Sequence, residues 1–107
     1  MEYKDKDFCI TILEDTVVFS GKLEKRDYTE IVNFLKQGED TIQAETVKVD
    51  LQALWFINSN GIKILAIFLT RSSKKFEVYI DEEVEWQENT LLVLNRIKPD
   101  GITIVRA

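Results

Sequence analysis

The sequence lacks histidine and contains a single cysteine, Cys9. Without histidine, the chain has neither the commonest metal ligand nor the commonest general base. One cysteine excludes an internal disulfide, and its position within an alternating apolar pattern predicts a small core residue. A Gly-rich phosphate loop and metal-ligand spacings are also missing. We therefore expect a protein that is not an enzyme, with no catalytic residue, no metal site and no cofactor.

Long hydrophobic runs are also missing. The longest uninterrupted apolar run covers residues 64–69, which is far too short to span a bilayer. Residues 1–7 are rich in charge and lack the apolar segment of a signal peptide. These features predict a cytoplasmic protein that does not insert into a membrane.

Basic residues are fewer than acidic ones, and the formal net charge is −5. A binder of nucleic acid needs a basic face to neutralise phosphates, so we expect no nucleic-acid partner. Acidic residues are concentrated in the segment 81–88. Such a cluster is typical of a solvated surface, and the other interpretation is a contact surface for a basic partner.

The length of 107 residues and the apolar content of 45% fit one globular domain, residues 1–107. Apolar residues at every second position predict strands over about 8–13, 17–19, 47–51, 76–80 and 102–105. The first two strands are close enough to form an antiparallel hairpin. Apolar residues at helical spacing predict three helices, around residues 28–35, 62–69 and 91–97.

The helix boundaries follow from capping residues. Asp27 followed by Glu30 forms a capping-box pattern for the first helix, and Gly38 is suited to end it. Asn89 or Thr90 can cap the third helix. The resulting order is β-β-α-β-α-β-α-β. Strands that alternate with helices predict an α/β domain with a mostly parallel sheet behind the N-terminal hairpin.

Four small or polar residues, Asn58, Ser59, Asn60 and Gly61, separate the apolar segment 54–57 from the apolar helix 62–69. Asn and Ser side chains accept hydrogen bonds from the free N–H groups of a first helical turn. Such a turn also presents the positive end of the helix dipole, which stabilises an anion or a phosphate on a side chain. Two interpretations follow, either a simple N-cap at Asn58 or Ser59 or an anionic site.

The order of residues around these four positions resembles the signature of the STAS family. The shared pattern is an apolar strand ending in Asp50 and Leu51, a Leu-x-Phe-Ile segment, a polar tetrad ending in Gly, and an Ile/Leu-rich helix. This family includes bacterial anti-sigma factor antagonists and cytoplasmic domains of sulfate transporters. The specific motif covers Asp50 to about Leu65, and the element order that the family implies covers roughly the whole chain.

The tetrad departs from the usual Asp-Ser-Ser-Gly of the antagonists. The second Ser is the usual phosphoacceptor, and it matches Asn60, which cannot be phosphorylated. The first Ser is kept as Ser59, and the leading Asp is replaced by Asn58. Ser59 is therefore the phosphorylation candidate, although a Ser in this place is equally explained as a cap.

The resemblance implies a regulatory protein-binding domain in a partner-switching pathway, with an anti-sigma factor or a serine-kinase-like protein as partner. Its partner-binding residues are then Asn58, Ser59, Asn60, Gly61 and Lys63. The loss of the usual acceptor favours an alternative, a non-switching docking subunit of a transporter or of a larger signalling complex.

Two aromatic residues, Trp55 and Phe56, precede the tetrad. Large aromatic residues are often hot spots of protein interfaces. Adjacent positions of a strand face opposite sides, so we expect one of the two to be buried and the other to be partly exposed. Trp86, in the acidic segment, is expected to cover the open end of the core.

Overall fold

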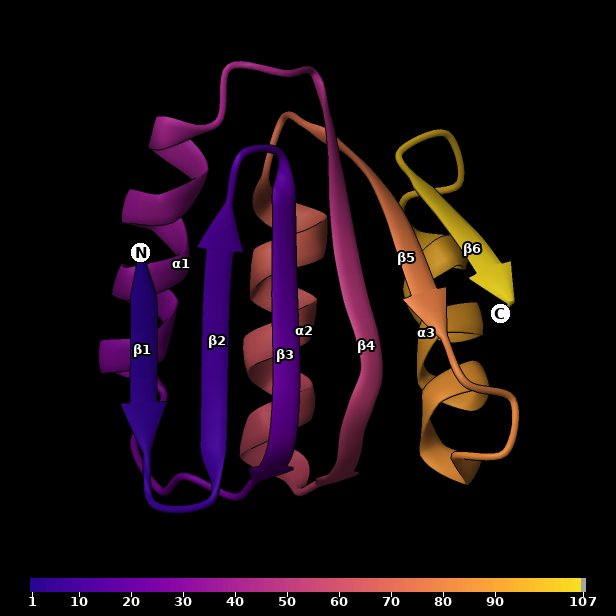
Figure 1. Cartoon of the computed structure of the whole chain (residues 1–107). Coiled ribbons are helices and arrows are strands. Elements are labelled where there is room, and N and C mark those ends of the chain that lie inside the picture. Colours follow the sequence, from indigo (N-terminus) through magenta and orange to yellow (C-terminus); the bar gives the residue numbers. More distant parts are fainter. Residues whose placement is uncertain (107) are drawn as a thin grey trace.

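The computed structural model describes residues 1–106 as six strands and three helices (Figure 1). In chain order they are β1 (Glu2–Asp5), β2 (Phe8–Leu13), β3 (Thr16–Leu23), α1 (Thr29–Thr41), β4 (Thr46–Ile57), α2 (Ser59–Arg71), β5 (Lys75–Ile80), α3 (Glu85–Ile97) and β6 (Ile102–Arg106). The predicted order is confirmed from β2 onward. The additional strand β1 lies in a charged segment whose sequence carries no strand pattern.

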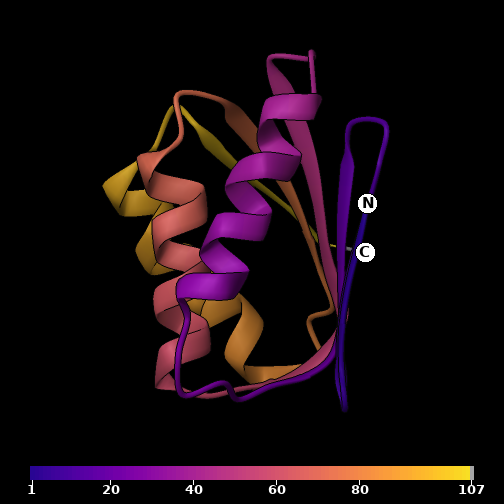
Figure 2. The same ribbon diagram turned by 90° about the vertical axis from the view of Figure 1, so that its left-hand side faces the viewer.

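The strands form one sheet in the order β1-β2-β3-β4-β5-β6. β1 and β2, and β2 and β3, pair antiparallel, whereas β3 to β6 pair parallel. Every parallel connection steps to the next strand in the same direction, so crossovers of one hand place all helices on one face. Figure 2 shows this arrangement, with α1, α2 and α3 on one side of the sheet and the other side uncovered. The protein is a single α/β domain with two layers.

The core lies between the sheet and the helices. Every second strand residue points into it, including Val47 and Val49 of β4, as the alternating pattern predicted. Several side chains on the uncovered face are half-buried, among them Val18, Asp50 and Tyr79. Cys9 belongs to this face, because its neighbours in β2 point into the core. The prediction that Cys9 is a core residue is therefore wrong.

β4 extends well beyond its neighbour β5. The two strands pair only over residues 46–50 of β4, so the second half of β4 has a free edge on that side. Gln87 of α3 covers this edge. Its Nε2 donates to the carbonyls of Leu51 at 2.6 Å and Leu54 at 3.0 Å, and its Oε1 accepts the N–H of Asp81 at 2.8 Å. One fully buried side chain therefore replaces the missing strand partner.

The first helix continues past the predicted end. Gly38 is buried inside α1, which ends at Thr41. A Cβ at Gly38 would collide with the side chain of Ile12, so the glycine allows α1 to approach β2 closely. The prediction that Gly38 ends the helix is wrong because local sequence does not reveal this contact.

The start of α1 also differs from the predicted cap. Tyr28 occupies the N-cap position and makes no side-chain cap. The carboxylate of Asp27 instead accepts the backbone N–H of Thr29 at 2.9 Å. This hydrogen bond lowers the pKa of Asp27, because it stabilises the ionised form.

The third helix begins at Glu85, four to five residues before the predicted caps Asn89 and Thr90. Acidic residues in its first turn, Glu85 and Glu88, suit the positive end of the helix dipole. Within the predicted helical segment 91–97, Leu91 and Leu94 are buried, whereas Ile97 is 64% exposed.

Candidate functional site

Asn58 joins β4 to α2 without an intervening loop. Its backbone is extended, and its Oδ1 accepts the N–H of Gly61 at 2.9 Å. Its own N–H donates to the carbonyl of Leu23 at 3.0 Å, which ties the helix start to the end of β3. Asn58 is therefore the N-cap of α2, and the predicted strand, polar junction and helix are confirmed.

Ser59 is the first residue of α2 and is exposed. Because Asn58 supplies the cap, the hydroxyl of Ser59 is not needed for capping. The N–H groups of the first helical residues point out of the helix end, where the dipole favours negative charge. An anionic group on Ser59 would therefore lie in a favourable field.

Asn60 is turned inward and holds a neighbouring loop. Its Nδ2 donates to the backbone carbonyls of Lys25 at 3.0 Å and Arg26 at 2.9 Å, both in the connection between β3 and α1. One amide group supplies both protons, whereas a serine hydroxyl has a single proton to donate. These two hydrogen bonds give a structural reason for Asn at position 60.

Gly61 is buried under the end of β4. A Cβ there would collide with the side chain of Ile57 and would lie 3.0 Å from Cγ of Leu23. The first turn of α2 therefore packs directly on the ends of β3 and β4. Gly61 belongs to the packing of the junction and has little surface to offer a partner.

Lys63 is exposed on the first turn of α2, and its Nζ lies 5.6 Å from the ring centroid of Tyr28. This cation–π contact holds the ammonium over the start of α1. Ile62, beside it, is 39% exposed. The exposed surface at the start of α2 therefore consists of Ser59, Ile62 and Lys63, and sequence reasoning did not single out Ile62.

Trp55 and Phe56 are both exposed, at 60% and 37%, with ring centroids 6.0 Å apart. The prediction that one of them is buried is wrong. The cause is an irregular register in which Gly21 pairs with Leu54 and Lys22 pairs with Phe56, so Trp55 is an extra residue in β4. Such a β-bulge interrupts the alternation of faces and redirects a side chain.

The other aromatic residues near this end of the sheet are held in place. The Nζ of Lys22 lies 5.1 Å from the ring centroid of Phe56 and 3.3 Å from the carboxylate of Glu24. Trp86 is half-buried against the core, and its Nε1 donates to the carbonyl of Leu54 at 3.1 Å. The prediction that Trp86 covers the open end of the core is confirmed.

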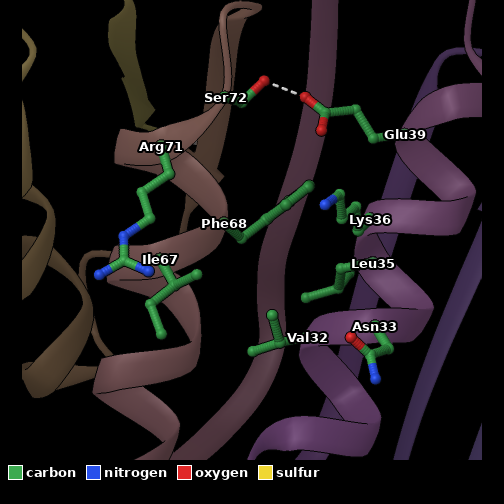
Figure 3. A pocket seen from close by; sticks show the side chains of 9 residues that line it. All are labelled: Val32, Asn33, Leu35, Lys36, Glu39, Ile67, Phe68, Arg71 and Ser72. Carbon is green, nitrogen blue, oxygen red and sulfur yellow. Dashed lines mark hydrogen bonds between the residues drawn. The ribbon is translucent and has the colours of Figure 1, made fainter.

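A hollow of about 310 Å³ lies between α1 and α2 (Figure 3). Figure 3 shows Val32 and Leu35 of α1 facing Phe68 of α2, and a hydrogen bond from Ser72 to Glu39 across one end. The residues that α2 contributes to this hollow, Ile67, Phe68 and Arg71, belong to its C-terminal half. The hollow is therefore separate from the tetrad at the opposite end of that helix.

Comparisons of the chain with models of protein families, with curated proteins and with solved structures found no match. Within residues 1–106, no helix combines the length and the apolar character needed to cross a membrane. In the same residues, no group of three or more acidic or cysteine side chains is arranged to hold a metal ion. The functional interpretation therefore depends on the sequence pattern and on the geometry of the tetrad.

Proposed function

We propose that this chain is a non-enzymatic regulatory domain that binds another protein through the beginning of α2, in the manner of an anti-sigma factor antagonist. The proposed partner is an anti-sigma factor or a serine-kinase-like protein in a cytoplasmic partner-switching pathway. The STAS-like pattern from Asp50 to Leu65 supports this proposal. The order of the elements from β2 onward agrees with the order that this resemblance implies.

The observation that carries the proposal is the division of roles within the tetrad. Asn58 caps the helix, Asn60 holds the neighbouring loop, and Gly61 is packed beneath it. Ser59 alone has an exposed side chain that none of these roles uses. A rigid helix start that presents one free hydroxyl beside Ile62 and Lys63 is suited to a contact that a modification can control.

Phosphorylation of Ser59 would act at the surface. A phosphate adds roughly two negative charges at one point. The helix N-terminus and Lys63, four residues later on the same face, would stabilise that charge within the domain. A closely fitted partner that places its own negative charge against this helix end would instead be repelled. The proposed switch therefore needs no refolding of the domain.

The side chain of Asn60 favours a second candidate function, a non-switching docking subunit of a transporter or of a larger signalling complex. The position of the usual acceptor is occupied by a side chain that cannot be phosphorylated and that is already engaged in two hydrogen bonds. In that case the same face would bind its partner permanently.

The two functions differ in their response to charge at Ser59. The tagged chain and its Ser59→Ala and Ser59→Glu variants are used to capture partners from the organism that encodes it, and the affinity is then measured with the purified partner. Ser73 is exposed just beyond the other end of α2, so Ser73→Glu is the matched control. For a switch, we expect a serine-kinase-like partner, unchanged binding of Ser59→Ala, and at least tenfold weaker binding of Ser59→Glu.

The phosphate itself is mapped by mass spectrometry after incubation with the captured partner and ATP. Phosphate on Ser59 supports the switch. Equal binding of all variants, with Ser59 unmodified, supports the docking subunit, and capture of a membrane complex supports its transporter form. Failure of the beginning of α2 to contribute to any captured complex would refute both functions.

A further inference from the structure

We propose that the hollow beside Trp55, between the end of β4 and the beginning of α3, binds a basic and apolar segment of the partner protein. The segment inserts an apolar side chain next to a Lys or Arg. This inference rests on the proposed function, since it names the chemistry of the partner that the domain binds.

The hollow is open and has a volume of about 600 Å³. It forms where β4 runs on past its pairing with β5 and the chain between β5 and α3 turns back (Figure 1). Its lining residues are Trp55, Phe56, Ile57, Glu83, Val84, Glu85, Trp86 and Asn89. Ile57 directly precedes the tetrad, so the hollow adjoins the surface at the start of α2.

The aromatic wall supplies the apolar contact. Trp55 is among the most exposed large hydrophobic residues of the described chain, and the bulge in β4 directs it outward. An exposed Trp adjoining a partly buried one is typical of the anchor region of a protein interface. Lys22 already lies over the ring of Phe56. The ring of Trp55 is the one left to contact a cation of the partner.

The charge around the hollow selects a basic occupant. Arg106 forms salt bridges with Glu82 and Glu88, with Nη2 of Arg106 2.7 Å from the carboxylate of Glu88. Glu83 and Glu85, which line the hollow, form no salt bridge with any residue in the described part of the chain. Two uncompensated carboxylates beside aromatic rings match a guanidinium or an ammonium.

Other occupants fit this surface less well. A purely apolar segment would cover Glu83 and Glu85 without pairing them, which is costly. An acidic segment would be repelled, and a second copy of the chain is itself acidic, with a net charge of −5. The walls are also preformed, because Gln87 and Trp86 fix the edge of β4 through hydrogen bonds. A preformed site loses little order on binding.

The test uses two synthetic peptides of 12 residues, one built from Leu, Ala and Lys and the other with Glu in place of Lys. Binding is followed by calorimetry and by tryptophan fluorescence, which reports directly because both tryptophans line the hollow. We expect the Lys peptide to bind and to change the fluorescence, and the Glu peptide not to bind. High salt should weaken the binding of the Lys peptide, because it screens the attraction between charges.

Variants then locate the binding. Trp55→Ala, and the pair Glu83→Gln with Glu85→Gln, should each reduce the affinity for the Lys peptide by about tenfold or more. Matched controls lie elsewhere on the surface. Leu13→Ala removes another exposed apolar side chain, and Asp40→Asn with Glu45→Gln removes two other exposed carboxylates. Both controls should bind like the wild type.

Equal binding of both peptides, unchanged affinity of Trp55→Ala, or an equal loss in the charge control would overturn the inference. Ser59→Glu separates it from the proposed function. This variant should lower the affinity for the captured partner. It should not lower the affinity for the Lys peptide, because added negative charge does not repel a basic segment. If Ser59→Glu releases the partner while Trp55→Ala does not, the proposed function stands and the role of the hollow is refuted.

Discussion

Gln87 offers the sharpest test of how the end of β4 is held. The side chain is fully buried, and its amide uses both protons and one oxygen lone pair on backbone groups. Gln87→Met keeps the length and shape of the side chain and removes all three hydrogen bonds. The carbonyl of Leu54 keeps a donor in Trp86, so the groups left without partners are the carbonyl of Leu51 and the N–H of Asp81.

The expected loss follows from these two groups. Each buried backbone group left unpaired costs about 1–3 kcal/mol, and the added burial of the thioether offsets part of the total. We therefore expect Gln87→Met to lower the free energy of unfolding by about 3 kcal/mol. A domain of this size has a total of about 5–15 kcal/mol, so the loss is a large share of it.

Urea unfolding followed by circular dichroism measures this loss. With a slope of about 1–2 kcal/mol/M, the midpoint should fall by about 2 M. Gln37→Met, on the exposed side of α1, is the control and should change stability by less than about 0.5 kcal/mol. A loss below about 1 kcal/mol in Gln87→Met would show that the amide does not replace the missing strand partner.

Gln87→Glu adds a pH dependence of known sign. The introduced carboxyl would face two carbonyl oxygens in a buried place, so its pKa in the folded state would lie above its unfolded value of about 4.3. The neutral acid still donates one hydrogen bond. The variant should therefore be least destabilised below about pH 4 and should lose further stability as the pH rises through the folded pKa. A difference from wild type that is constant with pH would contradict this reasoning.

Three further predictions concern the junctions around the sheet. Asn60→Ser removes the amide that holds the loop before α1, so it should lower the free energy of unfolding by about 1–2 kcal/mol, measured with urea. Hydrogen exchange in residues 24–28 should become faster. Asn33→Ser, on the exposed side of α1, is the control. Gly21 has φ of +95°, and a Cβ there would collide with the carbonyl of Asp7, so Gly21→Ala should cost at least about 2 kcal/mol in thermal unfolding. The pKa of Asp27 is lowered in the folded state, so its ionised carboxylate stabilises the fold above about pH 4. This contribution is lost as the pH falls through the folded pKa. Asp27→Ala should therefore differ most from wild type near neutral pH and should converge with it in acid.

The fold class could be predicted because the sheet is covered on one face. Residues such as Val47, Val49, Phe76 and Val78 alternate with polar neighbours, and each alternation marks one buried side of a strand. The N-cap at Asn58 was also readable, because its hydrogen bond to Gly61 spans three residues.

The features that escaped prediction depend on partners distant in sequence. Gln87 stands in an acidic run that reads as a loop, yet its carbonyl partners lie 33 and 36 residues earlier. Asn60 bonds to carbonyls 34 and 35 residues away. The exposure of Trp55 comes from a bulge that exists only when β4 pairs with β3. The local spacing of apolar residues does not reveal contacts between residues so far apart in the sequence. Gln87, Asn60 and Trp55 nevertheless shape the proposed site.

The two proposed contacts require a partner with both signs of charge. The start of α2 carries the positive helix end and Lys63, so it is suited to an acidic group of the partner. The adjoining hollow carries Glu83 and Glu85, so it is suited to a basic one. A phosphate on Ser59 would compete with the acidic group for the helix end and would leave the basic contact intact. Phosphorylation would therefore remove one of the two contacts and keep the other. The affinity for the partner would fall, but binding at the hollow would remain. The anchors at Asn58, Asn60 and Gly61 keep both contacts at a fixed separation, so the added charge acts on the partner without moving the hollow.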